Sequence, residues 1–209
     1  MSDAAIFPAS PRLEDYLLST AVIDADHPSV VAEARRLTAS CQGDVAIVRR
    51  LFEFVRDEVS HTCDVGGRSV TCIASEVLAQ RTGICFAKSH LLAALLRAVG
   101  VPAGFVYQQL RQDPPATGFV LHGLNGAYLA SVGRWVRFDA RGNKPGVDAQ
   151  FDLDCERLAF PTATERGERI DPAIYPAPNA RIVAALSQCD KLEDVWARLP
   201  SELRGAQGL

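Results

Sequence analysis

The segment from Cys85 to Val99 most limits how this chain can fold, because it reads as a helix with almost no polar face. A surface helix carries one apolar stripe opposite a charged face, so a helix that is apolar nearly all round is expected to be buried. Gly100 and Pro102 follow it and are typical helix stop signals. We therefore expect a central helix that the other elements surround.

The rest of the chain divides into helices, then strands, then helices again. Helical apolar spacing comes before the central helix, and strand-like alternation bounded by turn residues comes after it. The expected helices are 11–19, 28–40, 44–59, 75–81, 179–188 and 190–199, and the expected strands are 105–110, 119–129 and 135–140. This order favours an α+β fold, with a helical N-terminal half packed on an antiparallel sheet and C-terminal helices, over a parallel βαβ sheet.

Helix boundaries carry recognisable cap residues. Asp26 or His27 is placed to cap the helix that opens at Pro28, and Asn179 is placed to cap the helix that follows it. Asp190 with Glu193 resembles a capping box for the last helix. Residues 161–178 contain four prolines and are interpreted as a surface connection.

Length and composition narrow the function classes. With 209 residues, the chain is predicted to form a single domain over 1–209, in which 161–209 supply the C-terminal connection and helices. A net charge of −3 argues against a nucleic-acid partner. We find no apolar run near the roughly 20 residues that a membrane span needs, and no secretory signal. Six cysteines without a secretory signal predict reduced thiols and a cytoplasmic location.

Cys85 is the best candidate nucleophile among the six cysteines. It opens the central helix, where unpaired backbone N–H groups and the helix dipole favour a thiolate, and Gly83 permits a tight entry. The alternative is that Cys85 is only a small buried apolar residue. The other cysteines lie near expected helix C-termini, in a loop, or without a recognisable activating feature: Cys41, Cys189, Cys63, Cys72 and Cys155.

A nucleophilic cysteine needs a base, and His122 is the preferred choice among four histidines. His90 lies about 140° around the helix from Cys85, so we expect it to be structural, and we expect the same of the cap residue His27. Asp139 ends the strand after His122 and could orient its imidazole. Both could instead be structural, as a half-buried strand histidine and a turn residue.

The strand register between these two residues is left open by the sequence. A two-residue turn at Val132-Gly133 would place His122 and Asp139 on one face, but it would pair Asp139 with Gly126. A bulge near Gly126 would change both the pairing and the face.

Several runs resemble the core of the transglutaminase-like superfamily over about residues 45–145. They are Ser75 to Leu78, Gly83 to Ser89, Leu91 to Pro102, the strand that carries His122, and Trp135 to Asp139. The segments 55–61, 121–125 and 139–144 look most like small bacterial transglutaminase-like proteins that are described as cysteine proteases. One departure is Leu124, which stands where many members carry the Trp of a His-x-Trp motif.

The resemblance implies a papain-like core in which Cys85 is the nucleophile, His122 the base and Asp139 the residue that orients it. It implies hydrolysis of a peptide or amide bond through a thioester, without a cofactor or a catalytic metal. The Cys85 N–H is the natural first oxyanion donor. His61 is the preferred second donor, because relatives place a polar or aromatic side chain there. Gln80 and Asn125 are competitors for this role.

Three alternatives remain at this point. The same three residues would serve a transglutaminase that transfers the acyl group to a lysine amine. A binding module could keep the fold without catalysis. A metal site formed by His61, Cys63 and Cys72 is a third possibility, although this spacing is only half of a structural zinc motif. The substrate and the oligomeric state are not predicted.

Overall fold

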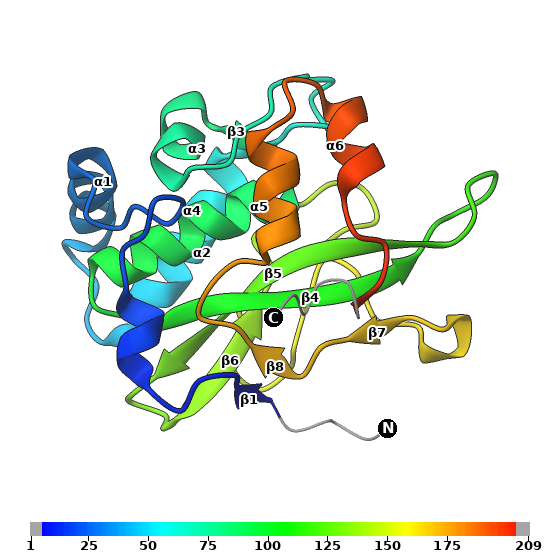
Figure 1. Cartoon of the computed structure of the whole chain (residues 1–209). Helices are drawn as coiled ribbons and strands as arrows, with labels where there is room; N and C mark the ends of the chain where they lie inside the picture. The colour runs from blue at the N-terminus through cyan, green and yellow to red at the C-terminus, as the bar shows by residue number, and fades with distance from the viewer. Residues whose placement is uncertain (1–5, 204–209) are drawn as a thin grey trace.

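The computed structural model describes residues 6–203 and places one long helix across the face of a curved antiparallel sheet (Figure 1). The elements before the sheet are β1 (Phe7–Pro8), η1 (Leu13–Leu17), α1 (Pro28–Thr38), α2 (Asp44–Glu58), β2 (Ser60–His61), α3 (Ala74–Gln80), β3 (Thr82–Gly83) and α4 (Cys85–Ala98). They confirm the helical N-terminal half. The predicted helix over 11–19 is reduced to the five-residue 3-10 turn η1.

Helix α4 is the buried centre that its composition predicts. Every residue from Cys85 to Arg97 is buried, and the leucines of the helix lie in the main apolar core. Burial extends to its polar side chains, which include Lys88 and Arg97. The cap prediction for α1 is also confirmed, because the His27 side chain accepts a hydrogen bond from the Ser29 N–H.

The main sheet has the strand order β6-β5-β4-β7. Its strands are β4 (Ala103–Arg111), β5 (Phe119–Leu129), β6 (Arg134–Phe138) and β7 (Arg169–Ile170). One face packs on α4 through β4 and β5, with residues such as Phe105 and Leu121 in the main core, while Phe138 of β6 packs against Phe52 of α2. On the other face, Tyr16 of η1 and Ile174 form a small cluster with Val106 and Leu124 of the sheet. The sheet is therefore covered on both faces, as its largely apolar strands require.

The β5–β6 hairpin settles the register that the sequence left open. Its loop has four residues, 130–133, and the N–H groups of Val132 and Gly133 both donate to the Leu129 carbonyl. The two-residue turn is therefore wrong. Asn125 pairs with Phe138 at the end of the ladder. Asp139 lies one residue beyond β6, so the same register places it beside Leu124, two residues from His122, rather than opposite Gly126.

The prediction that 161–178 is only a surface connection is wrong. This segment contains η2 (Thr164–Arg166), β7 and β8 (Ala173–Ile174). Strand β7 extends the main sheet by pairing with Gln108 and Gln109, and β8 pairs in parallel with β1. Strands of two residues are too short to give a periodic pattern, so prolines dominate the sequence signal.

Two C-terminal helices, α5 (Ala180–Ser187) and α6 (Leu192–Arg198), complete the fold. Asn179 caps α5 as predicted, because its Oδ1 accepts hydrogen bonds from the N–H groups of Arg181 and Ile182. The capping box at Asp190 and Glu193 is wrong, since Lys191 occupies the N-cap without a side-chain bond.

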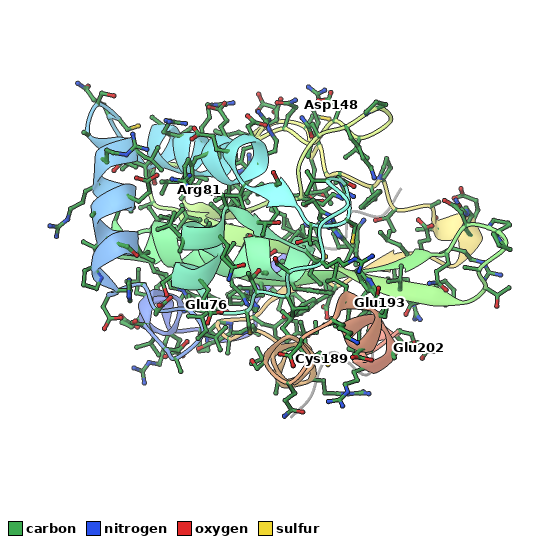
Figure 2. The ribbon with its side chains drawn as sticks, turned by 90° about the horizontal axis from the view of Figure 1, so that it is seen from above. Glu76, Arg81, Asp148, Cys189, Glu193 and Glu202 are labelled. Atoms are coloured by element: carbon green, nitrogen blue, oxygen red, sulfur yellow. The ribbon has the colours of Figure 1, made fainter. Side chains whose placement is uncertain are left out.

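Figure 2 shows Cys189, Glu193 and Glu202 around α5 and α6 on one side of the molecule and Asp148 on the opposite side. Within residues 6–203, none of the helices combines the length and the apolar character needed to cross a bilayer.

Candidate active site

Cys85 is placed by a short parallel strand pair that precedes its helix. Strand β2 pairs with β3 so that His61 lies opposite Gly83, two residues before Cys85. A Cβ atom on Gly83 would lie 2.9 Å from Ala87 Cβ and 3.0 Å from Thr71 Oγ1, so the close approach depends on glycine. The chain then turns into α4, and Cys85 is its first residue, only 6% exposed.

His122 and Asp139 form a buried hydrogen-bonded pair. The distance from His122 Nε2 to Asp139 Oδ2 is 2.7 Å, and the aspartate is completely buried. The same carboxylate accepts the N–H of Arg141 on Oδ1 and the N–H of Ala159 on Oδ2, each at 3.0 Å. Three donors therefore hold the Asp139 carboxylate in one orientation toward the imidazole.

The sulfur of Cys85 interacts with two imidazoles, those of His122 and His61. Because Nε2 of His122 is bonded to Asp139, Nδ1 is the ring nitrogen left to serve the sulfur. The structure thus brings together Cys85, His122 and Asp139, which the sequence places in three separate elements, and it adds His61 at the same sulfur.

The charges of these groups support one another. Burial acts to raise the pKa of the Cys85 thiol, but the interactions with His122 and then His61 outweigh it and lower this pKa to about 6. Burial acts to lower the pKa of His122, yet the charges of Asp139 and Cys85 raise it to about 10. The pKa of Asp139 is lowered despite burial, mainly by His122. At neutral pH the site therefore favours a thiolate beside an imidazolium.

The three candidates for a second oxyanion donor lie in different settings. His61 is buried beside Cys85, and nothing within residues 6–203 hydrogen-bonds its buried Nδ1 atom. Asn125 uses both amide hydrogens, on the carbonyls of Ser89 and Gly104, so it ties α4 to the sheet. Gln80 is exposed at the last residue of α3. Of the three, His61 has the setting that suits an oxyanion donor.

Sequence reasoning missed the chain segment that covers His122. The ring of Phe160 lies edge-on to the His122 ring, with 5.1 Å between centroids. The amide of Gln108 anchors this segment by donating to the Phe160 carbonyl at 2.9 Å and to Thr162 Oγ1 at 2.7 Å. Gln108 pairs with His122 across β4 and β5 and is fully buried. The sequence signal for this anchor is Gln108 itself, a polar residue in a strand that is otherwise largely apolar.

The remaining histidine and cysteine candidates have structural surroundings. His90 is buried, with Nδ1 2.8 Å from the Cys72 carbonyl oxygen, which confirms its structural role. Cys72 is buried beside the Ser187 hydroxyl, whereas Cys63 is exposed. Over residues 6–203, no three His, Cys, Asp or Glu side chains are grouped so that they could hold a metal ion.

The fold and the site together define a class of protein. A helix that begins at a cysteine packs on an antiparallel sheet that carries a histidine–aspartate pair, as in a papain-like core. Residues 32–140 match the family model described as the transglutaminase-like superfamily, and the chain belongs to this superfamily. The match includes Cys85, His122 and Asp139. No curated protein shows significant similarity to the chain.

Solved structures share the fold at low sequence identity. A "putative cysteine protease" of Cytophaga hutchinsonii is 20% identical, with a TM-score of 0.51, and the match covers 63% of this chain and 43% of that one. The periplasmic domain of TgpA from Pseudomonas aeruginosa, solved with ethylmercury, is also 20% identical, with a TM-score of 0.45 and coverages of 60% and 46%. The chain thus spans less than half of the length of these proteins.

Proposed function

We propose that this protein is a cysteine-dependent acyl-transfer enzyme that hydrolyses a peptide or amide bond through a thioester. The observation that carries this function is the buried pair of His122 and Asp139, 2.7 Å apart, together with the buried Cys85 at the start of α4, whose thiol pKa is lowered mainly by His122. Membership of the superfamily and the fold shared with a "putative cysteine protease" support the same class of reaction.

In the proposed reaction, the Cys85 thiolate attacks the amide carbonyl carbon and forms a C–S bond. The tetrahedral intermediate collapses, the C–N bond breaks, and the His122 imidazolium gives its proton to the leaving amine. The neutral imidazole then takes a proton from a water molecule, which attacks the thioester and releases the acid. The second tetrahedral intermediate collapses, the C–S bond breaks, and Cys85 leaves as the thiolate beside the re-formed His122 imidazolium, which Asp139 stabilises.

The negative oxygen of each tetrahedral intermediate needs donors. The backbone N–H of Cys85 is at the start of α4, where N–H groups have no partner within the helix and the dipole favours an anion. His61 supplies the second donor in this proposal, because it is the other ring beside the sulfur. One such donor typically contributes about 3 kcal/mol to lowering the barrier.

The proposed function also includes a substrate class and a cellular location. The substrate is a peptide or amide, in keeping with the nucleophile and the leaving group. A cytoplasmic location stays a prediction.

Competition among the cysteines tests the nucleophile. We expect iodoacetamide at pH 6 to modify Cys85 before Cys63, although Cys63 is exposed, because burial and Asp64 raise the pKa of the Cys63 thiol. Equal or slower reaction of Cys85, measured by mass spectrometry of digested protein, would contradict the proposal.

An electrophilic peptide library then samples the substrate. The expected adduct forms on Cys85 and is lost in His122→Ala, while peptides that label best become substrates for a hydrolysis assay. Adding an amine to that assay shows whether water or the amine is the preferred acyl acceptor. Amine incorporation that exceeds hydrolysis would assign the site to a transglutaminase instead.

A further inference from the structure

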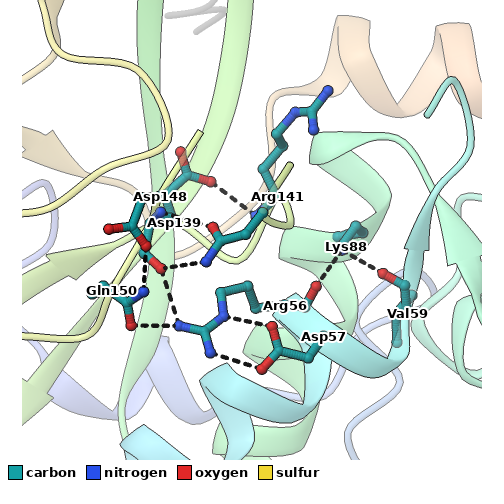
Figure 3. A network of polar contacts seen from close by, with 10 residues as sticks. Arg56, Asp57, Val59, Lys88, Asp139, Arg141, Asp148 and Gln150 are labelled. Atoms are coloured by element: carbon teal, nitrogen blue, oxygen red, sulfur yellow. Dashed lines mark hydrogen bonds and ion pairs between the residues drawn. The ribbon is translucent and has the colours of Figure 1, made fainter. Parts of the chain in front are cut away.

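Lys88 is a buried cation next to the proposed nucleophile that the reaction itself does not use. It lies three residues after Cys85 on α4, on the neighbouring turn, and is 1% exposed. Burying an ammonium group is costly unless its hydrogens are bonded. Its Nζ atom donates to two backbone carbonyls, those of Val59 at 2.5 Å and Arg56 at 3.4 Å (Figure 3).

These carbonyls belong to the C-terminal end of α2, where carbonyl groups lack partners within the helix. A cation at that end also complements the helix dipole. Strand β2 begins at the next residue, Ser60, and His61 follows it. Lys88 therefore fastens the chain two residues before His61 to the helix that carries Cys85.

The backbone pairing of β2 with β3 also holds the segment that carries His61. The Ser60 N–H donates to the Arg81 carbonyl, and the Thr62 N–H donates to the Gly83 carbonyl. The position of His61 is thus determined by the strand pair on one side and by Lys88 on the other. The Lys88 contact matters because the His61 ring is one of the two rings that stabilise the Cys85 thiolate.

The space around the ammonium is closed. A Cβ atom on Gly142 would lie 3.3 Å from both Lys88 Nζ and the Arg56 carbonyl oxygen. The charged groups that act on Lys88 are Arg141, Asp139, Asp57 and Asp64. Burial is the main cause that lowers the pKa of Lys88, to about 7, and Arg141 adds to it.

We propose that Lys88 is a positioning residue for the acyl-transfer site, which holds the His61 segment against the helix of the nucleophile. It acts through His61 and does not touch the substrate. This inference rests on the proposed function, since it concerns the activation of Cys85.

The test is the pH at which alkylation of Cys85 by iodoacetamide reaches half of its maximal rate. It is measured by mass spectrometry in the wild type, Lys88→Met, His61→Ala and the double variant. The titratable groups that lower the pKa of Cys85 are His122 and His61, and the charge of Cys85 in turn acts on Cys63 and Tyr107. We expect Lys88→Met to raise this midpoint by about 1 pH unit. The double variant should match His61→Ala alone.

Arg97 provides a matched control, because it is another buried cation on α4 that donates to backbone carbonyls. Arg97→Met should lower the melting temperature but leave the midpoint unchanged. If Lys88→Met does not fold, Lys88→Gln takes its place. Its shorter neutral amide keeps a donor and should raise the midpoint by a smaller amount.

An unchanged midpoint in the folded Lys88 variant, or shifts that add fully in the double variant, would overturn the role of Lys88 while leaving the proposed function intact. A wild-type midpoint at the ordinary value of a free thiol would instead overturn the proposed function.

Discussion

Nε2 of His122 lies 2.7 Å from Oδ2 of Asp139, in a pair that is shielded from solvent at the open end of the β5–β6 hairpin. The carboxylate also accepts two backbone N–H groups, so its position does not depend on the imidazole alone. This arrangement fixes which ring nitrogen of His122 remains for Cys85, and it makes the contribution of Asp139 directly measurable.

Asp139→Asn keeps the shape of the side chain but removes its charge. We expect kcat for a library-derived peptide to fall by roughly 10³-fold or more, because the imidazolium loses its stabilising partner. The pKa of His122, followed by NMR, should fall, since the Asp139 charge is the main cause that raises it against burial. A variant that retains most of the activity would show that Asp139 is only structural.

Hydrolysis should depend on pH with two limbs. The Cys85 pKa is about 6 and the His122 pKa about 10, so the ion pair of thiolate and imidazolium exists between these values. The rate should rise as pH increases through 6 and fall as it passes 10. A profile of kcat/KM that rises only above pH 8 would contradict this state of the site.

The same two pKa values set how the site affects stability. The lowered thiol pKa contributes stability that is present above the unfolded value of about 8.5 and is lost as pH falls through 6. The raised imidazole pKa contributes stability that is present below the unfolded value of about 6.5 and is lost as pH rises through 10. The free energies of unfolding of the wild type and His122→Ala, measured in urea, should therefore differ most between pH 6 and pH 10. A constant difference across the pH range would contradict the coupling.

Phe160→Ala should expose the His122–Asp139 pair to water. We expect a loss of kcat of roughly 10-fold or more, because the imidazole is held less firmly. Phe119→Ala is a matched control, since Phe119 is also a half-buried aromatic residue with a guanidinium near its ring. Equal effects of the two substitutions on kcat would show that Phe160 has no special relation to the site.

Gly83→Ala should disturb the entry to α4. The added methyl group would contact Ala87 and Thr71 too closely, which costs about 1–3 kcal/mol of stability. Alkylation of Cys85 at pH 6 should slow as well. Gly126→Ala crowds Ile174 on the face of the sheet away from α4. It should therefore lower the stability of the protein without slowing the alkylation of Cys85. If both variants alkylate at the wild-type rate, Gly83 does not position the nucleophile.

The central helix and the residues at its start could be predicted from the sequence because their signals are local. A largely apolar surface indicated the burial of α4, and the helix N-terminus indicated Cys85 as the nucleophile. The contact between Cys85 and His61 could not be predicted in this way, because it depends on a pairing of two-residue strands. The cover formed by Phe160 depends on a long irregular segment, and its anchor Gln108 is distant in sequence. Burial of Lys88 runs against the usual exposure of lysine and follows from the carbonyls at the end of α2.

The most direct measurement is the rate of Cys85 alkylation as a function of pH in the intact protein, compared with His122→Ala. The wild-type rate should reach half of its maximum near pH 6, and His122→Ala should move this midpoint upward because the main group that lowers the thiol pKa is gone. A wild-type midpoint near 8.5, the ordinary value of a free cysteine, or no difference between the two proteins, would contradict a thiolate stabilised by His122.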